Sequence, residues 1–230
     1  MKHVVIAIPA YTGTVHISTV RPLFHDMAAL VLRGDKVTLI DDIGCAYLDD
    51  TRAWIVDKFL STPGDVLVMV DHDICWEGNA LVRLVDRPVD LVAGVYPKRT
   101  DPIEYPVRYI LERSELISDP KTGLLEVAGV PAGFLKMSRT MLERMVEHYK
   151  DLNFNTARSP NGKLCGLFEG YRMSNGGKLQ DDYAFCQRWR DIGGQVWCDP
   201  EIKMSHTGNK AFVGHFGDWL RSRPQEDKAA

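Results

Sequence analysis

The chain has 230 residues, of which 45% are hydrophobic and 26% are charged, and its formal net charge is only −3. This is the composition of an ordinary globular protein, and the length suits one large domain or two small ones. Because the net charge is small and no long basic run occurs, bulk electrostatics give no reason to expect a nucleic-acid or membrane-surface partner.

The cysteines and the amino-terminal segment indicate the compartment. The apolar run at residues 4–8 is too short for a signal-peptide core, and no stretch approaches the length of a membrane span. The five cysteines are scattered and form no CxxC pair, which argues against a disulfide framework or a structural zinc site. We therefore expect a cytoplasmic protein with cysteines that serve as small core residues.

Strands and helices alternate in the first part of the chain. Apolar, β-branched runs predict strands at residues 4–8, 36–40, 66–70 and 91–95, with the first buried on both faces and 66–70 the clearest buried strand. Between them we expect helices at 50–60 and 81–85, and a first helix that Gly34 closes. The apolar residues of that first helix are Ile17, Val20, Leu23, Phe24, Met27, Leu30 and Val31. This order predicts an open sheet with right-handed crossovers.

The second part of the chain has a different pattern. A turn at 119–123 predicts a hairpin between residues 108–112 and 124–127, and a further strand follows at 134–137. Thr140 and Glu143 form a capping box for a helix that runs to about Tyr149. Residues 150–180 read as a long loop, and a helix begins near Asp181. We expect one domain over residues 1–220, with a nucleotide-binding half (1–98), a second half (99–220) and a frayed tail (221–230).

Polar clusters follow the predicted strands at residues 9–13, 41–42 and 71–73. Ligands of open α/β sheets bind outside the carboxyl ends of the strands, so these clusters should meet at one crevice. In an extended segment Asp71 and Asp73 would face the same side, with His72 pointing away. Two such carboxylates repel each other unless a cation lies between them, and a hard divalent ion completed by water and phosphate oxygens suits that place. A polar turn after a strand is the plainer interpretation.

Several sequence blocks together resemble GT-A glycosyltransferases. An arginine-bearing helix precedes a strand that ends in the Asp-x-Asp motif at 71–73, and further blocks follow in the family's order. These blocks are Val92–Lys98, Ala132–Leu135, Gln180–Cys186 and His206–Gly208. The resemblance covers roughly residues 4 to 215. It implies a Rossmann-like α/β fold for nucleotide-diphospho-sugar transferases, with a mostly parallel central sheet flanked by helices, and glycosyltransferase activity of the hexosyltransferase class.

The resemblance also implies where the donor binds. Pro9, Ala10 and Tyr11 match the turn that holds the base and ribose. Asp42 would accept hydrogen bonds from base or ribose, or serve only as a turn acid. Arg52 would balance the diphosphate or Asp71, because its fork can engage two oxygens, or would be a solvated helix residue.

A metal site is implied in the same way. Asp73 would bind the ion directly, Asp71 would share it or reach the ribose, and His206 matches the family's late metal ligand. The ion would be Mn²⁺, with Mg²⁺ as the alternative. His72 is counted among the residues that contact the donor. Lys98, with Arg99, could supplement the charge of the ion, and Gly133 would form a floor near the donor sugar.

Asp181 and Asp182 open a predicted helix, where carboxylates also serve as caps. The family commonly has Glu-Asp here, so Asp181 departs from its pattern. The second acid, Asp182, is the expected general base that deprotonates the acceptor hydroxyl, although it could orient the acceptor without proton transfer.

The expected substrates are a UDP- or GDP-sugar and a glycan, lipid or other hydroxyl acceptor. Two alternatives stay open: a sugar-phosphate nucleotidyltransferase and a non-catalytic nucleotide-sugar-binding protein of the same fold. The first would normally carry a basic, glycine-rich loop after the first strand, and residues 9–13 contain no lysine or arginine. Inversion or retention at the sugar and the oligomeric state stay undecided.

Overall fold

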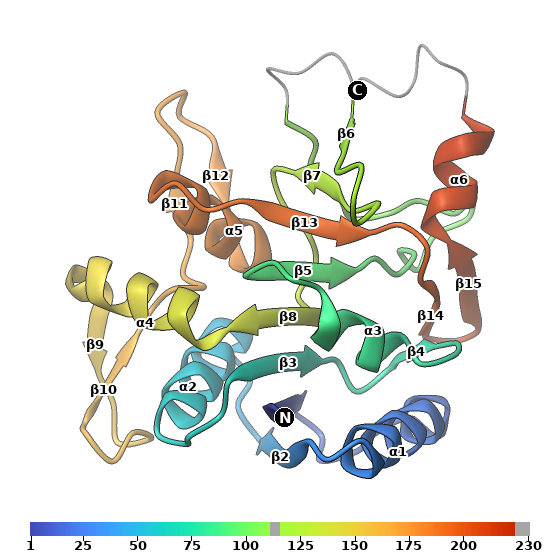
Figure 1. Ribbon diagram of the computed structural model, residues 1–230. Helices are drawn as coiled ribbons and strands as arrows, with labels where there is room; N and C mark the ends of the chain where they lie inside the picture. Colours follow the sequence, from blue (N-terminus) through green and yellow to red (C-terminus); the bar gives the residue numbers. More distant parts are fainter. Residues whose placement is uncertain (111–115, 224–230) are drawn as a thin grey trace.

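The computed structural model describes residues 1–110 and 116–223, and its centre is an eight-stranded mixed sheet (Figure 1). The strand order is β2-β1-β3-β8-β5-β13-β7-β6. These strands are β1 (His3–Ala10), β2 (Lys36–Ile43), β3 (Val66–Val70), β5 (Leu91–Gly94), β6 (Ile117–Ser118), β7 (Leu125–Val127), β8 (Phe134–Ser138) and β13 (Val196–Asp199).

The helices and small sheets surround this layer. The helices are α1 (Ile17–Leu32), α2 (Leu48–Leu60), α3 (Ala80–Asp86), α4 (Arg139–His148), α5 (Asp181–Asp191) and α6 (Phe216–Ser222), with the 3₁₀ turn Lys150–Leu152. A three-stranded sheet contains β4 (Ile74–Trp76), β14 (Lys203–Thr207) and β15 (Ala211–His215). Two small hairpins pair β9 (Asn153–Asn155) with β10 (Lys163–Cys165) and β11 (Tyr171–Arg172) with β12 (Lys178–Leu179). Among the described residues no helix is both long enough and apolar enough to cross a bilayer.

The central strands confirm the α/β prediction. β1 runs parallel to β2 and β3, and β5 runs parallel to β13, while β8 lies antiparallel between β3 and β5. Every residue of β1 and β3 is buried because helices cover both faces of the sheet. Leu23 of α1 and Leu84 of α3 pack on one face, and Phe59 of α2 and Phe185 of α5 pack on the other.

Several boundaries differ from the predicted ones. β1 and β2 continue through Ala10 and Ile43, so Pro9 and Asp42 belong to strands and not to turns. The helix α4 is capped by Ser138, whose hydroxyl accepts from the amide of Met141 at 3.2 Å, and Thr140 lies inside the first turn.

The second part of the chain also departs from the predictions. The first hairpin strand is Ile117–Ser118 and not 108–112, of which residues 111 and 112 lie outside the described residues. The segment 150–180 contains two short hairpins. Arg221 belongs to the helix α6, so the tail begins later than the predicted residue 221. Residues 224–230 lie outside the described part.

Only part of the predicted apolar pattern of α1 is buried. Leu23 and Leu30 are buried, but Ile17, Phe24 and Val31 are 65%, 68% and 56% exposed. The helix carries apolar residues on two sides, and only one side rests on the sheet.

Candidate active site

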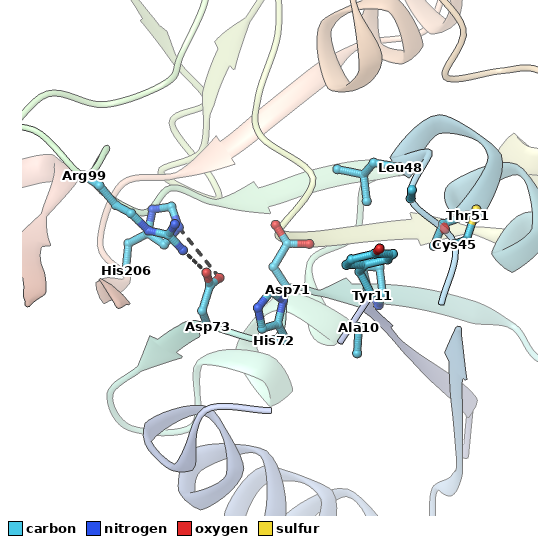
Figure 2. Close-up of a pocket in the computed structure, with 12 residues that line it drawn as sticks. Ala10, Tyr11, Cys45, Leu48, Thr51, Asp71, His72, Asp73, Arg99 and His206 are labelled. Atoms are coloured by element: carbon cyan, nitrogen blue, oxygen red, sulfur yellow. Dashed lines mark hydrogen bonds and ion pairs between the residues drawn. The ribbon is translucent and has the colours of Figure 1, made fainter. Parts of the chain in front are cut away.

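A cavity of about 510 Å³ opens at the carboxyl ends of β1 and β3. It is lined by Pro9, Ala10, Tyr11, Cys45, Ala46, Leu48, Thr51, Asp71, His72, Asp73, Arg99 and His206 (Figure 2). Two of the three predicted polar clusters, 9–13 and 71–73, therefore meet here. The third does not reach the cavity, and the loop after β2 contributes Cys45 and Ala46 in its place.

One wall of the cavity comes from the end of β1. Pro9 and Ala10 end the strand, and Tyr11 follows in a turn where the amide of Gly44 donates to its carbonyl at 3.1 Å. Tyr11 is 61% exposed, and its ring lies beside Ala10, with Thr51 and Cys45 on the same side of the cavity (Figure 2). This wall offers an aromatic face and backbone groups to a flat ligand.

Asp42 and Lys98 lie outside the cavity lining. Both oxygens of Asp42 accept from Nη2 of Arg158, at 2.6 and 2.5 Å, and the residue is buried. Nζ of Lys98 is 2.9 Å from Glu104. Of the two neighbouring residues predicted to supplement the charge, Arg99 lines the cavity and Lys98 does not.

The Asp-x-Asp segment is a turn and not an extended strand end. The amide of Ile74 donates to the carbonyl of Asp71 at 3.3 Å, which closes the turn. Both carboxylates line the cavity as predicted, but His72 lines it as well and does not point away (Figure 2).

His206 reaches Asp73 through a strand that the sequence did not reveal. β4 begins directly after the Asp-x-Asp turn and pairs with β14, with Ile74 opposite His206. Nδ1 of His206 donates to the carbonyl of Pro97 at 3.1 Å, which leaves Nε2 unprotonated, 3.7 Å from Oδ1 of Asp73. Burial, followed by the nearby charge of Arg99, lowers the pKa of His206 to about 4. The imidazole is therefore neutral at physiological pH, as a metal ligand must be.

The cavity suits a cation that takes most of its ligands from a bound substrate. In the described part of the chain no three His, Cys, Asp or Glu side chains are grouped as a ready-made metal site. Asp73 and His206 nevertheless present a carboxylate and a free imidazole nitrogen together, and Asp71 lines the same space. The guanidinium of Arg99 contacts Asp73, so a positive charge already fits beside this carboxylate. Such a donor set fits Mn²⁺ or Mg²⁺ completed by phosphate and water oxygens.

Arg52 lies outside the cavity lining and contacts three carboxylates. Its side chain is 2% exposed, it forms ion pairs with Asp181 and Asp182, and its Nη2 is 3.9 Å from Oδ1 of Asp71. Burial lowers the pKa of Arg52, but the attraction of the carboxylates outweighs it and the pKa is raised overall. Arg52 is therefore neither a solvated helix residue nor part of the cavity lining.

Asp181 and Asp182 differ in their surroundings. Oδ1 of Asp182 accepts from Arg52 and Oδ2 accepts from the amide of Ala132 at 2.9 Å, so both oxygens are used. Asp181 has a positive φ of 47° and lines a second cavity of about 260 Å³, which shares Leu48 with the first. Burial first, and then the charge of Asp182, raise the pKa of Asp181 to about 7, although Arg52 opposes the shift.

The backbone of Gly133 is hydrogen-bonded to both Tyr96 and Asp71. The amide of Gly133 donates to the hydroxyl of Tyr96 at 3.3 Å, and its carbonyl accepts from the amide of Asp71 at 2.9 Å. The ring of Tyr96 meets His206 edge-on, with centroids 5.0 Å apart. Tyr96 was assigned no role from the residue pattern, in which its place after an apolar strand was the available signal.

Neither protein-family models nor curated protein sequences give a match to this chain. Among solved structures, A197 from STIV is similar over 90% of this chain and 86% of its own, with 17% identity and a TM-score of 0.54. HddC from Yersinia pseudotuberculosis (12% identity, 62% and 79% covered, TM-score 0.35) shows a weaker likeness. So does a glycosyltransferase involved in the glycosylation of the major capsid of PBCV-1 (11%, 61% and 62%, 0.33). At these values the likeness to A197 concerns the fold alone, and the GT-A resemblance stays a prediction.

Proposed function

We propose that the protein is a metal-dependent glycosyltransferase of the hexosyltransferase class, which moves a sugar from a nucleotide-diphosphate donor to an acceptor hydroxyl. One observation carries the proposal: Asp71, Asp73 and neutral His206 line one part of a cavity whose other wall is Tyr11. Acidic groups at this place repel a diphosphate unless a cation is bound between them. The cavity thus combines a base-stacking face with groups that hold a cation.

The residues divide into donor-binding and cation-binding sets. Tyr11 stacks on the base, while Pro9 and Ala10 contact the ribose. Asp73 and His206 hold the ion and Asp71 shares it. A divalent cation, when bound, supplies the positive charge that anchors the diphosphate and stabilises it as a leaving group. Arg99 lines the same space and is placed to bind a phosphate oxygen.

Asp181 is the better candidate for the general base. Asp182 has both oxygens occupied by Arg52 and Ala132. Asp181 faces the second cavity, and a pKa near 7 suits a group that must take a proton at physiological pH. The acceptor hydroxyl would bind on that side. Asp182 and Arg52 then act as positioning residues.

The first experiment is a thermal-shift measurement with UDP and GDP, each with and without Mn²⁺. Binding to the folded state raises the midpoint, so one nucleotide should raise it only when Mn²⁺ is present. Asp73→Asn should remove that response, whereas the control Asp86→Asn, at the end of α3 and outside the cavity lining, should keep it. A folded Asp73→Asn protein that responds like the wild type would contradict the ion's assigned ligand.

A second measurement separates the chemistries. Incubation with a nucleotide-sugar should release nucleoside diphosphate. Release of pyrophosphate from a sugar phosphate and a nucleoside triphosphate would identify a nucleotidyltransferase. Nucleotide binding with neither reaction would identify a binding protein.

A further inference from the structure

The carboxylate of Asp73 is already in contact with a positive charge at the place assigned to the ion. The guanidinium of Arg99 contacts Oδ2 of Asp73, while Oδ1 faces Nε2 of His206 at 3.7 Å (Figure 2). Because the imidazole is neutral, Asp73, Arg99 and His206 together carry no net charge. A divalent ion that arrived alone would therefore gain one carboxylate but would be repelled by the guanidinium at short range.

The side chain of Arg99 has room to leave Asp73. It is 43% exposed, against 14% for Asp73, and ion pairs that reach the solvent in this way contribute little to stability. Its aliphatic part lies against Gly208, where an added Cβ would be 3.0 Å from Cδ of Arg99. Arg99 also lines both the main cavity and a neighbouring hollow of about 500 Å³. The guanidinium can therefore turn without moving the strands of the central sheet.

We propose that Arg99 makes cation binding conditional on the diphosphate. When a nucleotide diphosphate enters the cavity, the guanidinium exchanges Asp73 for a phosphate oxygen. The released carboxylate then binds the ion together with His206. Without the nucleotide, Arg99 stays on Asp73 and opposes the ion. The inference rests on the proposed function, because it concerns the same cation and the same diphosphate.

The exchange is favourable because a diphosphate offers more negative charge and more oxygens than one carboxylate. A guanidinium fork binds phosphate oxygens well, and a divalent ion takes phosphate oxygens as ligands. Both positive groups thus find partners on the nucleotide, which removes the repulsion that keeps them apart at Asp73 alone. Such coupling is reciprocal, so the ion and the nucleotide each strengthen the binding of the other.

Two other roles for Arg99 predict different results. Metal-binding carboxylates are commonly held by an outer hydrogen-bond donor, and in that role Arg99 would stay on Asp73 and support the ion under all conditions. Alternatively, Arg99 would take the place of the ion, and the nucleotide would bind equally well without metal. The sign of the change on removing Arg99 separates these roles from the proposed one.

The first measurement is Mn²⁺ binding to the full chain without nucleotide, followed by the loss of the electron paramagnetic resonance signal of free Mn²⁺. Arg99→Gln should bind Mn²⁺ about tenfold more tightly than the wild type, because the repulsion by the guanidinium is gone. Arg99→Lys keeps the positive charge and should bind Mn²⁺ as weakly as the wild type.

The second measurement is the titration of each protein with UDP and with GDP at a fixed Mn²⁺ concentration. The nucleotide that binds the wild type should bind Arg99→Gln about tenfold more weakly, because the phosphate loses a charged partner. Arg99→Gln is therefore expected to change the two affinities in opposite directions. The control is Arg172→Gln, an exposed arginine of β11 outside both linings, and it should match the wild type in both measurements.

Two results would overturn the inference alone. One is weaker Mn²⁺ binding by folded Arg99→Gln both with and without nucleotide, which would make Arg99 an orienting group for Asp73. The other is a folded Arg99→Gln protein with the affinities of the wild type. In both cases the wild type still binds Mn²⁺ with its nucleotide, so the proposed function stands. A wild type whose nucleotide binding does not respond to Mn²⁺ would contradict the proposed function and the inference together. The thermal midpoint of each variant shows whether it is folded.

Discussion

Nδ1 of His206 donates to the carbonyl of Pro97 at 3.1 Å, and this bond fixes which nitrogen faces Asp73. A carbonyl can only accept, so the proton lies on Nδ1 and the lone pair lies on Nε2. Backbone carbonyls commonly orient metal-binding imidazoles in this way. Pro97, which follows β5, thus orients His206 of β14 so that its Nε2 faces Asp73 in the turn after β3.

His206→Gln should weaken Mn²⁺ binding about tenfold or more, since loss of mere outer-shell partners already costs about 10- to 100-fold. The readout is the Mn²⁺ concentration needed for half of the nucleotide-dependent thermal shift. His215→Gln, a histidine outside the cavity lining, is the control and should leave that concentration unchanged. Equal behaviour of the two variants would remove His206 from the ligand set.

Gly133→Ala should both destabilise the fold and disturb the site. An added Cβ would lie 2.6 Å from the hydroxyl of Tyr96 and would also collide with Oδ2 of Asp71. Overpacking of this kind costs roughly 1–3 kcal/mol. Urea unfolding should show that loss, and the nucleotide response to Mn²⁺ should weaken as Asp71 moves.

Gly177→Ala is the matched control for this substitution. Its added Cβ would meet Oδ1 of Asn175 at 3.0 Å on a surface hairpin, and the Asn175 side chain is exposed. We expect a change within about 0.5 kcal/mol and an unaltered response to Mn²⁺. A Gly133→Ala protein as stable and as responsive as this control would contradict the close contact with Asp71.

The sequence predicted β1, β3, β5 and β8 well because continuous apolar runs are a strong signal, but it did not predict the central strand β13. The run at 66–70 became β3 without a change of boundary. The sequence could not reveal β4, because the three residues Ile74–Trp76 are too few to form a recognisable pattern. This strand nevertheless brings His206 to Asp73. Nor could it show that α1 is apolar on two sides, since helical spacing does not say which side meets the sheet.

Long-range ion pairs were equally hidden from the sequence. Arg52 was expected beside the diphosphate or Asp71, and it does lie 3.9 Å from Asp71, but its ion pairs with Asp181 and Asp182 at the start of α5 were not foreseen. Asp42 was expected at the base or ribose, but Arg158 occupies it. The three acids and the two arginines were visible as residues, whereas their pairing depends on how distant segments pack.

Asp42→Asn should lower stability with little effect on nucleotide binding. The substitution removes a charged acceptor from Arg158, and such hydrogen bonds are worth roughly 1.5–3 kcal/mol when the acceptor is buried. Urea unfolding measures the loss, and the neighbouring Asp41→Asn, on an exposed position of the same strand, should cost little. A protein of unchanged stability whose nucleotide response is lost would restore Asp42 to the binding site.

Arg52→Met should be among the most damaging single substitutions. It leaves Asp71, Asp181 and Asp182 without their shared cation, and breaking a buried ion pair from one side costs roughly 3–5 kcal/mol. Arg52→Lys keeps the charge but loses the fork, so its cost should be smaller. The exposed Arg172→Met is the control and should change stability by less than about 0.5 kcal/mol.

The damage in Arg52→Met should grow with pH. Arg52 lowers the pKa of Asp71 and Asp181, so without it both carboxyls hold their protons to higher pH in the folded state. A raised folded pKa favours the folded state at low pH, and this contribution is lost as the pH rises through that pKa. Urea unfolding at pH 5 and pH 8 should therefore show the larger deficit at pH 8. An equal deficit at both values would mean that the carboxyls do not respond to Arg52.

The pH dependence of donor turnover should identify the base. If Asp181 takes the proton, the rate rises with pH and is half-maximal near 7, because burial raises the pKa of Asp181 to about that value and only the ionised form accepts a proton. Asp181→Asn should lower the rate by about 10²- to 10⁴-fold and remove this limb of the profile. In Asp182→Asn the limb should persist but move to lower pH, because the charge of Asp182 is one cause of the raised pKa of Asp181. If Asp182→Asn removes the limb and Asp181→Asn retains it, the proton goes to Asp182, as the sequence first suggested.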